Sequence, residues 1–321
     1  MIYKPIIIVA GEPNSIFSEI FFKSFKNKSF KSPIILIASK SLIELQMKRL
    51  KIKKKIKLIT FANLKKNHLD NKKINLFNVS FNQKKAFDKI SNKSNYYIKK
   101  SFDIALKILS KKITNKFING PISKKFFLKK KYLGITEYLA HRTKTKNFAM
   151  LIYNKDLSVC PLTTHLPLKK VSKKIDKYMI KKKIKLIDTF YKKILKQKPK
   201  IAITGLNPHC ESVDSFNEDE KIIKPTIKSL NKLNYKLSGP FSADTIFLKR
   251  NRKKYNIIVG MYHDQVLTPL KTLFEYDAIN ITLGLPFIRV SPDHGPNEKM
   301  LGNNESNPLS LIKSIKFLDT K

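Results

Sequence analysis

The sequence predicts an α/β protein in which short buried strands alternate with longer amphipathic helices. Several Ile- and Val-rich runs, such as residues 6–10 and 34–38, have the length and composition of strands. The segments between such runs carry apolar residues at helical spacing. This alternation predicts a largely parallel, doubly wound sheet, in which ligands bind beyond the carboxyl ends of the strands.

The predicted strands are short runs rich in residues that favour β-structure, namely residues 6–10, 34–38, 116–119, 148–153, 201–206, 255–261 and 278–283. Two segments between them have clear helical periodicity, residues 82–112 and residues 172–196. In the first, Phe87, Ile98 and Phe102 fall on one predicted apolar face.

Length and composition exclude several classes of protein. The chain has 321 residues, 42% of them hydrophobic, which is enough for two domains or one long α/β domain. No apolar window is long enough to span a membrane. The first apolar run, residues 6–10, is too short for a signal-peptide core, and no small-residue cleavage site follows it. Two cysteines, Cys160 and Cys210, give no disulfide framework, so we expect a cytoplasmic protein that does not bind membranes.

The charge is strongly positive, with 66 Lys and Arg against 23 Asp and Glu, a formal net charge of +43. One interpretation is a non-catalytic, basic nucleic-acid-binding protein, because clustered cations release counterions from phosphates. The other is a lysine-rich coding bias. The lysines are spread along the whole chain, accompany abundant Asn and Ile, and form no nucleic-acid-binding motif, so we favour solvated lysine faces and no specific nucleic acid.

Three histidines occupy similar places at the ends of strand-like runs. His165 follows such a run, His209 follows the strand predicted at 201–206, and His263 follows the strand predicted at 255–261. Strand ends in one parallel sheet share an edge, so these imidazoles are candidate ligands of one divalent metal ion. Three protein ligands with open positions are typical of a catalytic metal site.

Anion-binding side chains follow His263 in the sequence. Lys271 and Arg289 are candidates to hold a carboxylate or phosphate, Arg289 in bidentate fashion, and Asn280 is a candidate donor to an oxygen. Arg is scarce in this chain, so Arg289 in an apolar, Pro-rich segment suggests a specific partner.

The segment 291–295 (SPDHG) has the composition of a loop that lies along a cofactor, because its glycine permits close backbone approach. No Gly-x-Gly-x-x-Gly fingerprint is present, so any NAD would not bind in the Rossmann manner.

Three further residues have weaker interpretations. Ser123, after Gly120 and Pro121, is predicted to cap a helix, and Asp244 either caps a helix or lies near the metal. Cys210 has no paired base, so we do not expect it to be a nucleophile.

These residues together resemble the 4-hydroxythreonine-4-phosphate dehydrogenases of vitamin B6 (pyridoxine) biosynthesis. The resemblance runs from Gly11 to about Gly302, nearly the whole chain, and its strongest blocks are 163–168 (TTHLPL), 205–209 (GLNPH), 239–240 (GP) with 243–245 (ADT), 261–265 (MYHDQ), 280–286 (NITLGLP) and 291–295 (SPDHG). Their order and spacing are specific in combination.

The resemblance implies an α/β/α fold like that of isocitrate and isopropylmalate dehydrogenases, with two subdomains and a cleft between them. We place subdomain 1 at residues 1–140 plus 285–321 and subdomain 2 at residues 141–284. It also implies a homodimer with the active site at the subunit interface.

The resemblance further implies NAD or NADP as cofactor and a divalent metal (zinc, magnesium or cobalt). It assigns the metal to His165, His209 and His263, which are catalytic together with Lys271. The implied substrate contacts are Thr136, Lys271, Asn280 and Arg289, and the implied cofactor contacts are Asp293, His294, Gly295 and Asn297.

The sequence departs from the family at a few positions. The usual His before Thr136 is Ile135, and the loop after Gly295 reads Pro296-Asn297, with Lys299 in place of an acidic residue. A dehydrogenase of the same fold for another phosphorylated hydroxy acid, such as a phosphothreonate, therefore remains an alternative, as does a family member without catalysis.

Overall fold

A computed structural model describes residues 3–26, 29–62, 64, 69–129, 131–292 and 294–321 of the chain. The chain divides into two compact units. Unit 1 comprises Met1–Leu139 and Pro286–Lys321, and unit 2 comprises Ala140–Leu285.

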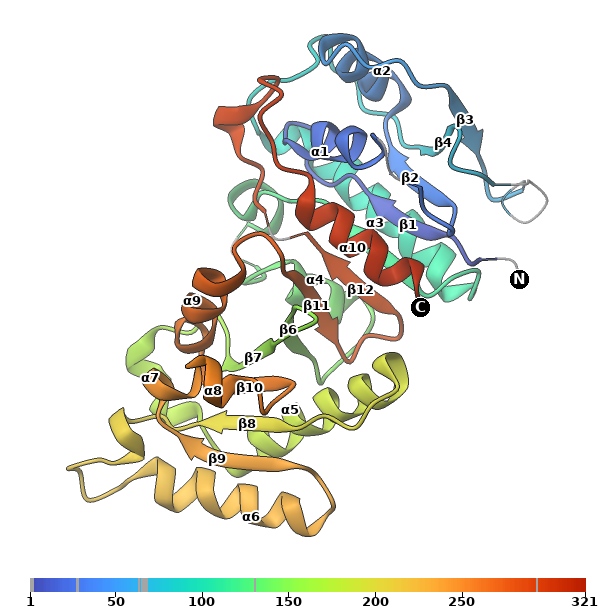
Figure 1. Cartoon of the computed structure of the whole chain (residues 1–321). Coiled ribbons are helices and arrows are strands. Elements are labelled where there is room, and N and C mark those ends of the chain that lie inside the picture. The colour runs from blue at the N-terminus through green and yellow to red at the C-terminus, as the bar shows by residue number, and fades with distance from the viewer. Residues whose placement is uncertain (1–2, 27–28, 63, 65–68, 130, 293) are drawn as a thin grey trace. The chain divides into compact units, whose positions relative to one another are not determined.

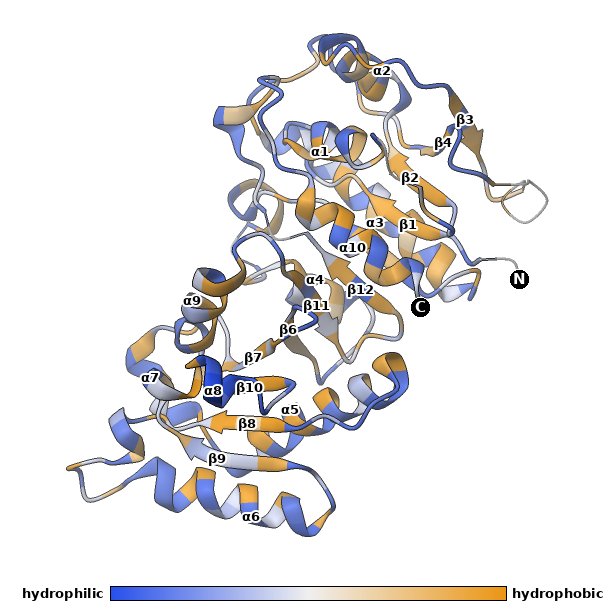
Figure 2. Ribbon diagram, in the orientation of Figure 1, coloured by the Kyte–Doolittle hydropathy of each residue, from blue (hydrophilic) through white to orange (hydrophobic). Residues whose placement is uncertain are grey.

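The described part of unit 1 contains a parallel sheet in the order β3-β4-β2-β1-β5-β12. Its central strands are buried on both faces, which explains their continuous apolar sequence (Figure 2). The strands are β1 (Ile6–Val9), β2 (Ile34–Ala38), β3 (Ile56–Ile59), β4 (Ile74–Asn78), β5 (Lys116–Asn119) and β12 (Ile288–Ser291).

Helices cover both faces of this sheet (Figure 1). On one side α10 (Leu309–Asp319) packs against α1 (Phe17–Ser24), and α2 (Lys40–Arg49) contacts α1. On the other side α3 (Asn95–Ser110) packs against β1 and β2. A short helical turn spans Lys124–Leu128, and α4 (Ile135–Arg142) carries the chain out of unit 1.

Unit 2 contains strands in the order β11-β6-β7-β10-β8-β9. Pairing is parallel from β7 to β9 and antiparallel on both sides of β6. The strands are β6 (Ala149–Tyr153), β7 (Ser158–Thr163), β8 (Ile201–Thr204), β9 (Leu237–Phe241), β10 (Ile257–Tyr262) and β11 (Ile279–Leu283).

The helices of unit 2 also lie on both sides of its sheet. Val266 and Leu270 of α9 (His263–Phe274) share a core cluster with Ile258 of β10. Against the other side, α5 (Lys177–Phe190) packs on β7 and α6 (Lys224–Lys232) packs on β9. Two short helices, α7 (Ala243–Ile246) and α8 (Lys249–Arg252), precede β10.

All seven predicted strands are present, and the mixed α/β class is confirmed. The strands β3, β4, β7, β9 and β12 were not predicted as such. Residues 239–245 were interpreted as a turn before a helix, yet Gly239 lies within β9. A Cβ on Gly239 would lie 2.3 Å from the Ile203 carbonyl oxygen, so the glycine permits this close pairing with β8.

The prediction of a helix over residues 82–112 was wrong at its beginning, since α3 starts at Asn95. Side chains from elsewhere bind the backbone of the preceding segment: Asn14 Oδ1 accepts from Asp88 N at 2.9 Å, and Gln46 Nε2 donates to Ala86 O at 3.1 Å. These tertiary bonds replace helical ones. The helix predicted over residues 172–196 was also wrong at its beginning. That segment starts with a short turn, and α5 begins after Asp176, whose side chain caps it.

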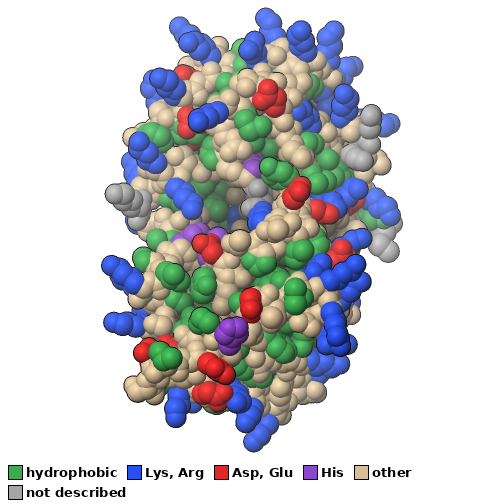
Figure 3. Space-filling view, turned by 60° about the vertical axis from the view of Figure 1, so that its left-hand side comes forward, with side chains coloured by type: hydrophobic (Ala, Val, Ile, Leu, Met, Phe, Trp, Pro, Cys, Tyr) green, Lys and Arg blue, Asp and Glu red, His purple; other side chains and the backbone are tan. Residues whose placement is uncertain are grey.

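Within the described residues, no helix has the length and apolar character needed to cross a membrane. Cys160 and Cys210 are both free, as expected. Lys and Arg side chains are scattered over the face seen in Figure 3, among far fewer Asp and Glu side chains.

Phe102 of α3 is fully buried and contacts the rings of Phe117, Phe127 and Tyr138. We expect Phe102→Ala to lower the free energy of unfolding of unit 1 by about 3–5 kcal/mol, because it leaves a cavity in this aromatic cluster. Urea denaturation followed by circular dichroism measures the change. Tyr96→Ala on the same helix, where the side chain is 72% exposed, is the control and should stay within about 0.5 kcal/mol of wild type.

Candidate functional site

The three candidate histidines follow three neighbouring parallel strands of unit 2. Thr163 at the end of β7 lies opposite Tyr262 at the end of β10, and β8 pairs with the other side of β10. His165, His263 and His209 therefore all leave the sheet at the same edge, the carboxyl edge, where α/β proteins bind ligands.

Two of the histidines have an unusual backbone conformation. His165 has φ of 53° and His209 has φ of 54°, and Cys210 after it has φ of 64°. Non-glycine residues seldom occupy this left-handed region, and such residues concentrate at functional sites. The two loops hold their histidines in conformations that the sequence alone did not reveal.

The structure brings two of the three imidazoles together. The ring centroids of His165 and His263 are 6.1 Å apart. His209 is exposed on its own loop, and no group of three His, Cys, Asp or Glu side chains among the described residues converges as a complete metal site. The assignment of all three histidines to one ion stays a prediction.

A hydrogen-bond network ties the three strand ends to one another. Thr163 Oγ1 donates to Met261 O at 2.8 Å, which links β7 to β10. The Gln265 side chain links β10 to β8: its Oε1 accepts from Met261 N at 2.7 Å and Thr204 Oγ1 at 2.8 Å, and its Nε2 donates to Gly205 O at 2.8 Å.

Asp219, which is fully buried, shapes the loop before His209. Its two carboxylate oxygens accept from Leu206 N at 2.8 Å and from Asn207 N at 3.1 Å, and Asn207 Nδ2 donates to it at 3.0 Å. Sequence reasoning missed both Asp219 and Gln265. For Gln265, the sequence offered one signal, its place within the 261–265 block. For Asp219 it offered none, because the fold brings this residue to the loop.

The chemistry of this edge fits a divalent metal ion. Imidazole is a preferred ligand for zinc and cobalt. His263 Nδ1 is held by Asp264 Oδ1 at 2.6 Å, which leaves Nε2 of His263 available. A carboxylate on the distal ring nitrogen is the usual support of a metal-binding histidine.

The other predicted residues of unit 2 lie on neighbouring elements. Lys271 is on α9, and burial lowers the pKa of its ammonium group. Asn280 is on β11, and its Oδ1 is shielded from solvent without a hydrogen-bond partner among the described residues. An oxygen of this kind can accept a hydrogen bond from water or from a bound ligand.

In unit 1 the structure places Arg289 beside Thr136. Arg289 is fully buried on β12; its Nε donates to Asn119 Oδ1 at 2.8 Å and its Nη1 to Thr136 Oγ1 at 3.1 Å. Burial lowers the pKa of the guanidinium to about 10, opposed by the nearby carboxylate of Glu137. The group is still cationic at neutral pH, and two side chains fix its orientation.

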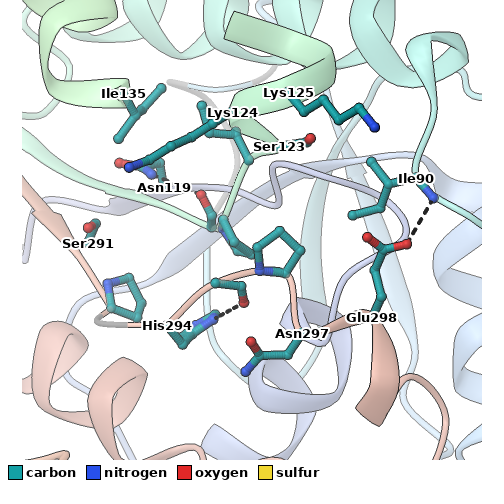
Figure 4. Close-up of a pocket in the computed structure, with 16 residues that line it drawn as sticks. Ile90, Asn119, Ser123, Lys124, Lys125, Ile135, Ser291, His294, Asn297 and Glu298 are labelled. Atoms are coloured by element: carbon teal, nitrogen blue, oxygen red, sulfur yellow. Dashed lines mark hydrogen bonds between the residues drawn. The ribbon is translucent and has the colours of Figure 1, made fainter. Parts of the chain in front are cut away.

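A pocket of about 480 Å³ opens in unit 1 where the 294–298 segment faces the Gly120–Ser123 turn (Figure 4). Among the candidate cofactor residues, His294, Gly295 and Asn297 line it, and Asp293 lies outside the described residues. His294 Nδ1 lies 3.1 Å from Gly295 O, and burial lowers the pKa of the imidazole. Ile135, the departure from the family pattern, also lines the pocket.

Glu12 is a buried carboxyl group close to this pocket that sequence reasoning did not single out. Its backbone N–H donates to Pro121 O at 2.8 Å, and Ser94 Oγ donates to its carboxylate at 3.0 Å. Burial raises the pKa of Glu12, and the charge of Glu298 adds to this effect, while hydrogen bonds from Asn14 and Ser94 oppose it.

The three weaker interpretations have different outcomes. Ser123 is confirmed as a cap, since its Oγ accepts from Phe126 N at 3.2 Å. Asp244 makes no cap hydrogen bond in α7 and is exposed. Burial raises the pKa of the Cys210 thiol, which disfavours the thiolate and agrees with its exclusion as a nucleophile.

The fold and these strand-end residues define an α/β protein with candidate ligand-binding groups at the carboxyl ends of its strands. Residues 29–318 match the family described as pyridoxal phosphate biosynthetic protein PdxA. The chain is 38% identical over 318 residues to the 4-hydroxythreonine-4-phosphate dehydrogenase of Sulfurihydrogenibium sp. strain YO3AOP1, covering 97% of this chain and 96% of the relative. The chain therefore belongs to the PdxA family.

Two further similarities are to a solved structure and to an enzyme with a different name. The crystal structure of 4-hydroxythreonine-4-phosphate dehydrogenase from Klebsiella pneumoniae aligns with a TM-score of 0.86 and 26% identity, covering 98% of this chain and 97% of that one. The D-threonate 4-phosphate dehydrogenase of Salmonella typhimurium strain LT2 is 37% identical over 187 residues, 58% of this chain and 57% of that enzyme.

Removing the carboxylate that supports His263 tests the metal-site interpretation. We expect Asp264→Ala to weaken Co²⁺ binding about 10–100-fold, as is typical for loss of such a support, with little change in stability because Asp264 is 80% exposed. Calorimetric titration with Co²⁺ gives the affinity. Asp156→Ala, in the turn before β7, is the control and should bind Co²⁺ like wild type; equal affinity in both variants would contradict the role of Asp264.

The raised pKa of Glu12 predicts a pH-dependent stability. A carboxyl group whose pKa is higher in the folded than in the unfolded state stabilises the fold below its unfolded pKa and loses that contribution as pH rises through its folded pKa. We therefore expect the stability of wild type relative to Glu12→Gln to fall between acid and neutral pH, measured by urea denaturation across that range. The exposed Glu44→Gln serves as control, and a difference that stays flat with pH would refute the prediction.

Proposed function

We propose that this protein oxidises 4-phosphohydroxy-L-threonine with NAD, or NADP in its place, and a divalent metal ion. The product, 2-amino-3-oxo-4-(phosphooxy)butanoate, decarboxylates to 3-amino-2-oxopropyl phosphate, a step of pyridoxine 5′-phosphate biosynthesis. Support comes from the end-to-end similarity to a relative of that name. The observation that carries the proposal is the set of three histidines at the carboxyl ends of the adjacent strands β7, β10 and β8.

In this proposal His165, His209 and His263 hold the metal ion, which is zinc, magnesium or cobalt. A bound divalent cation lowers the pKa of a hydroxyl group and stabilises negative charge on a neighbouring oxygen, which is the chemistry that both the oxidation and the decarboxylation need. Asp264 orients His263, and the Gln265 and Asp219 networks hold the loops in register.

The cationic and polar side chains bind the anionic substrate. Arg289, held by Asn119 and Thr136, is pre-organised to bind a carboxylate or phosphate without losing side-chain freedom. Lys271 supplies a second cation, and the lowered pKa of its ammonium group also suits it to proton transfer near the reacting carbon. Asn280 supplies a polar contact from β11.

We assign the nicotinamide cofactor to the pocket lined by His294, Gly295 and Asn297. Asp293 belongs to the same proposed set of contacts. The absence of the Rossmann fingerprint agrees with a site built from the 294–298 loop and the Gly120–Ser123 turn. Lys124 and Lys125 on the pocket wall favour the phosphates of a dinucleotide.

A second candidate function is oxidation of D-threonate 4-phosphate. Two observations favour it: the similarity to the Salmonella typhimurium enzyme of that name, and Ile135 in the pocket, where an apolar side chain replaces a polar contact. A kcat/KM comparison of the two phosphorylated substrates decides between them.

We further propose that the chain acts in the cytoplasm as a homodimer whose active site lies at the subunit interface, and that it has no specific nucleic-acid partner. Light scattering coupled to size exclusion measures the oligomeric state.

The decisive experiment measures NADH formation with 4-phosphohydroxy-L-threonine, NAD and Co²⁺, before and after chelation. We expect metal-dependent NADH formation in wild type. His209→Ala should lose at least about 100-fold in activity, because removing a metal ligand has a larger effect than removing the group that supports it. The variant should also lose Co²⁺ while keeping its circular dichroism spectrum. His141→Ala, in the last turn of α4, is the matched control and should retain both. Full activity and bound metal in His209→Ala would falsify the ligand assignment.

A further inference from the structure

A second cavity in unit 1 is lined mainly by lysines. It has a volume of about 550 Å³ and is lined by Tyr3, Lys4, Lys31, Lys116, Asp319, Thr320 and Lys321. Lys116 begins β5, Tyr3 and Lys4 precede β1, and the other residues come from the loop before β2 and the end of α10. The cavity therefore lies at the amino edge of the strands whose carboxyl ends lead to the pocket of Figure 4.

Lys116 distinguishes this cavity from the solvated lysine faces of the protein, because it is only 3% exposed. Its ammonium group donates to Ser32 Oγ at 3.0 Å. Among the described residues no carboxylate lies within ion-pair distance of it and no other protein acceptor binds it, so two of its three N–H donors face the cavity without a protein partner among these residues. A buried cation without a counter-charge is costly unless another anion compensates it.

The aspartate in the cavity wall is already engaged. Asp319 Oδ1 accepts from Ser32 N at 2.6 Å and Asp319 Oδ2 accepts from Lys31 N at 3.0 Å, so this side chain holds the backbone before β2. Four lysines thus face one aspartate whose oxygens bind main-chain donors. The burial that isolates Lys116 also lowers the pKa of its ammonium group, and the charge of Lys4 contributes to this while Asp319 opposes it.

We propose that this cavity is a second anion-binding site, separate from the catalytic residues, that takes a small molecule with more than one phosphate group. Lysine ammonium groups are point charges that bind phosphate oxygens without a fixed geometry. Several lysines around one cavity suit a polyanion better than a single phosphate. Lys116 binds from the floor of the cavity, and Lys4, Lys31 and Lys321 bind from its rim.

The site is tested by calorimetric titration of the intact protein with inorganic pyrophosphate, and with inorganic phosphate for comparison. We expect saturable binding of pyrophosphate, tighter than that of phosphate, that weakens as ionic strength rises. Lys116→Met keeps the length of the side chain and removes its charge, and it should weaken pyrophosphate binding at least about tenfold.

One control locates the binding. Lys228→Met, on the exposed side of α6, removes one charge elsewhere and should bind pyrophosphate like wild type. If Lys116→Met does not fold, the double variant Lys31→Gln/Lys321→Gln at the rim replaces it and should show the same loss. Absence of saturable binding in wild type, or wild-type affinity in the folded Lys116 or rim variants, overturns the proposal.

Discussion

The arrangement of the histidine-bearing edge depends on one side chain that joins two strand ends. Gln265 accepts from the backbone of β10 and donates to the backbone that follows β8, and Thr163 extends the same network to β7. Parallel strands bring their carboxyl ends to one edge, but they do not by themselves fix the loops beyond it. Side-chain hydrogen bonds to the loop backbone supply that precision.

The two units position their candidate ligand-binding side chains in different ways. In unit 1, Arg289 is fully buried and is fixed by Asn119 and Thr136, so its charge is positioned before any substrate arrives. In unit 2, the histidines are exposed or half-exposed. There, hydrogen bonds fix the loop backbone instead, as the bond from Leu206 N to Asp219 does before His209. The proposed function gives both sets of residues a role, because its substrate is anionic and has a hydroxyl group that needs activation.

The lysines that give the chain its net charge do not all occupy the same kind of environment in the structure. Most lysines lie on exposed faces, where water and counterions screen them. Lys116 is an exception, since it is buried beside Ser32 in a cavity with three other lysines. A compositional bias towards lysine therefore explains the exposed lysines, but it does not explain why Lys116 is buried.

The sequence by itself determined the α/β class, the central strands and the three strand-end histidines, because apolar periodicity and residue type are local signals. Only the tertiary structure decided where α3 begins, since Asn14 and Gln46 bind the preceding backbone from distant parts of the chain. The same holds for β9, whose Gly239 and Pro240 read locally as a turn, and for Asp219, which reaches the His209 loop through folding. Contacts between residues far apart in sequence leave no periodic pattern, and this is the physical reason they could not be predicted.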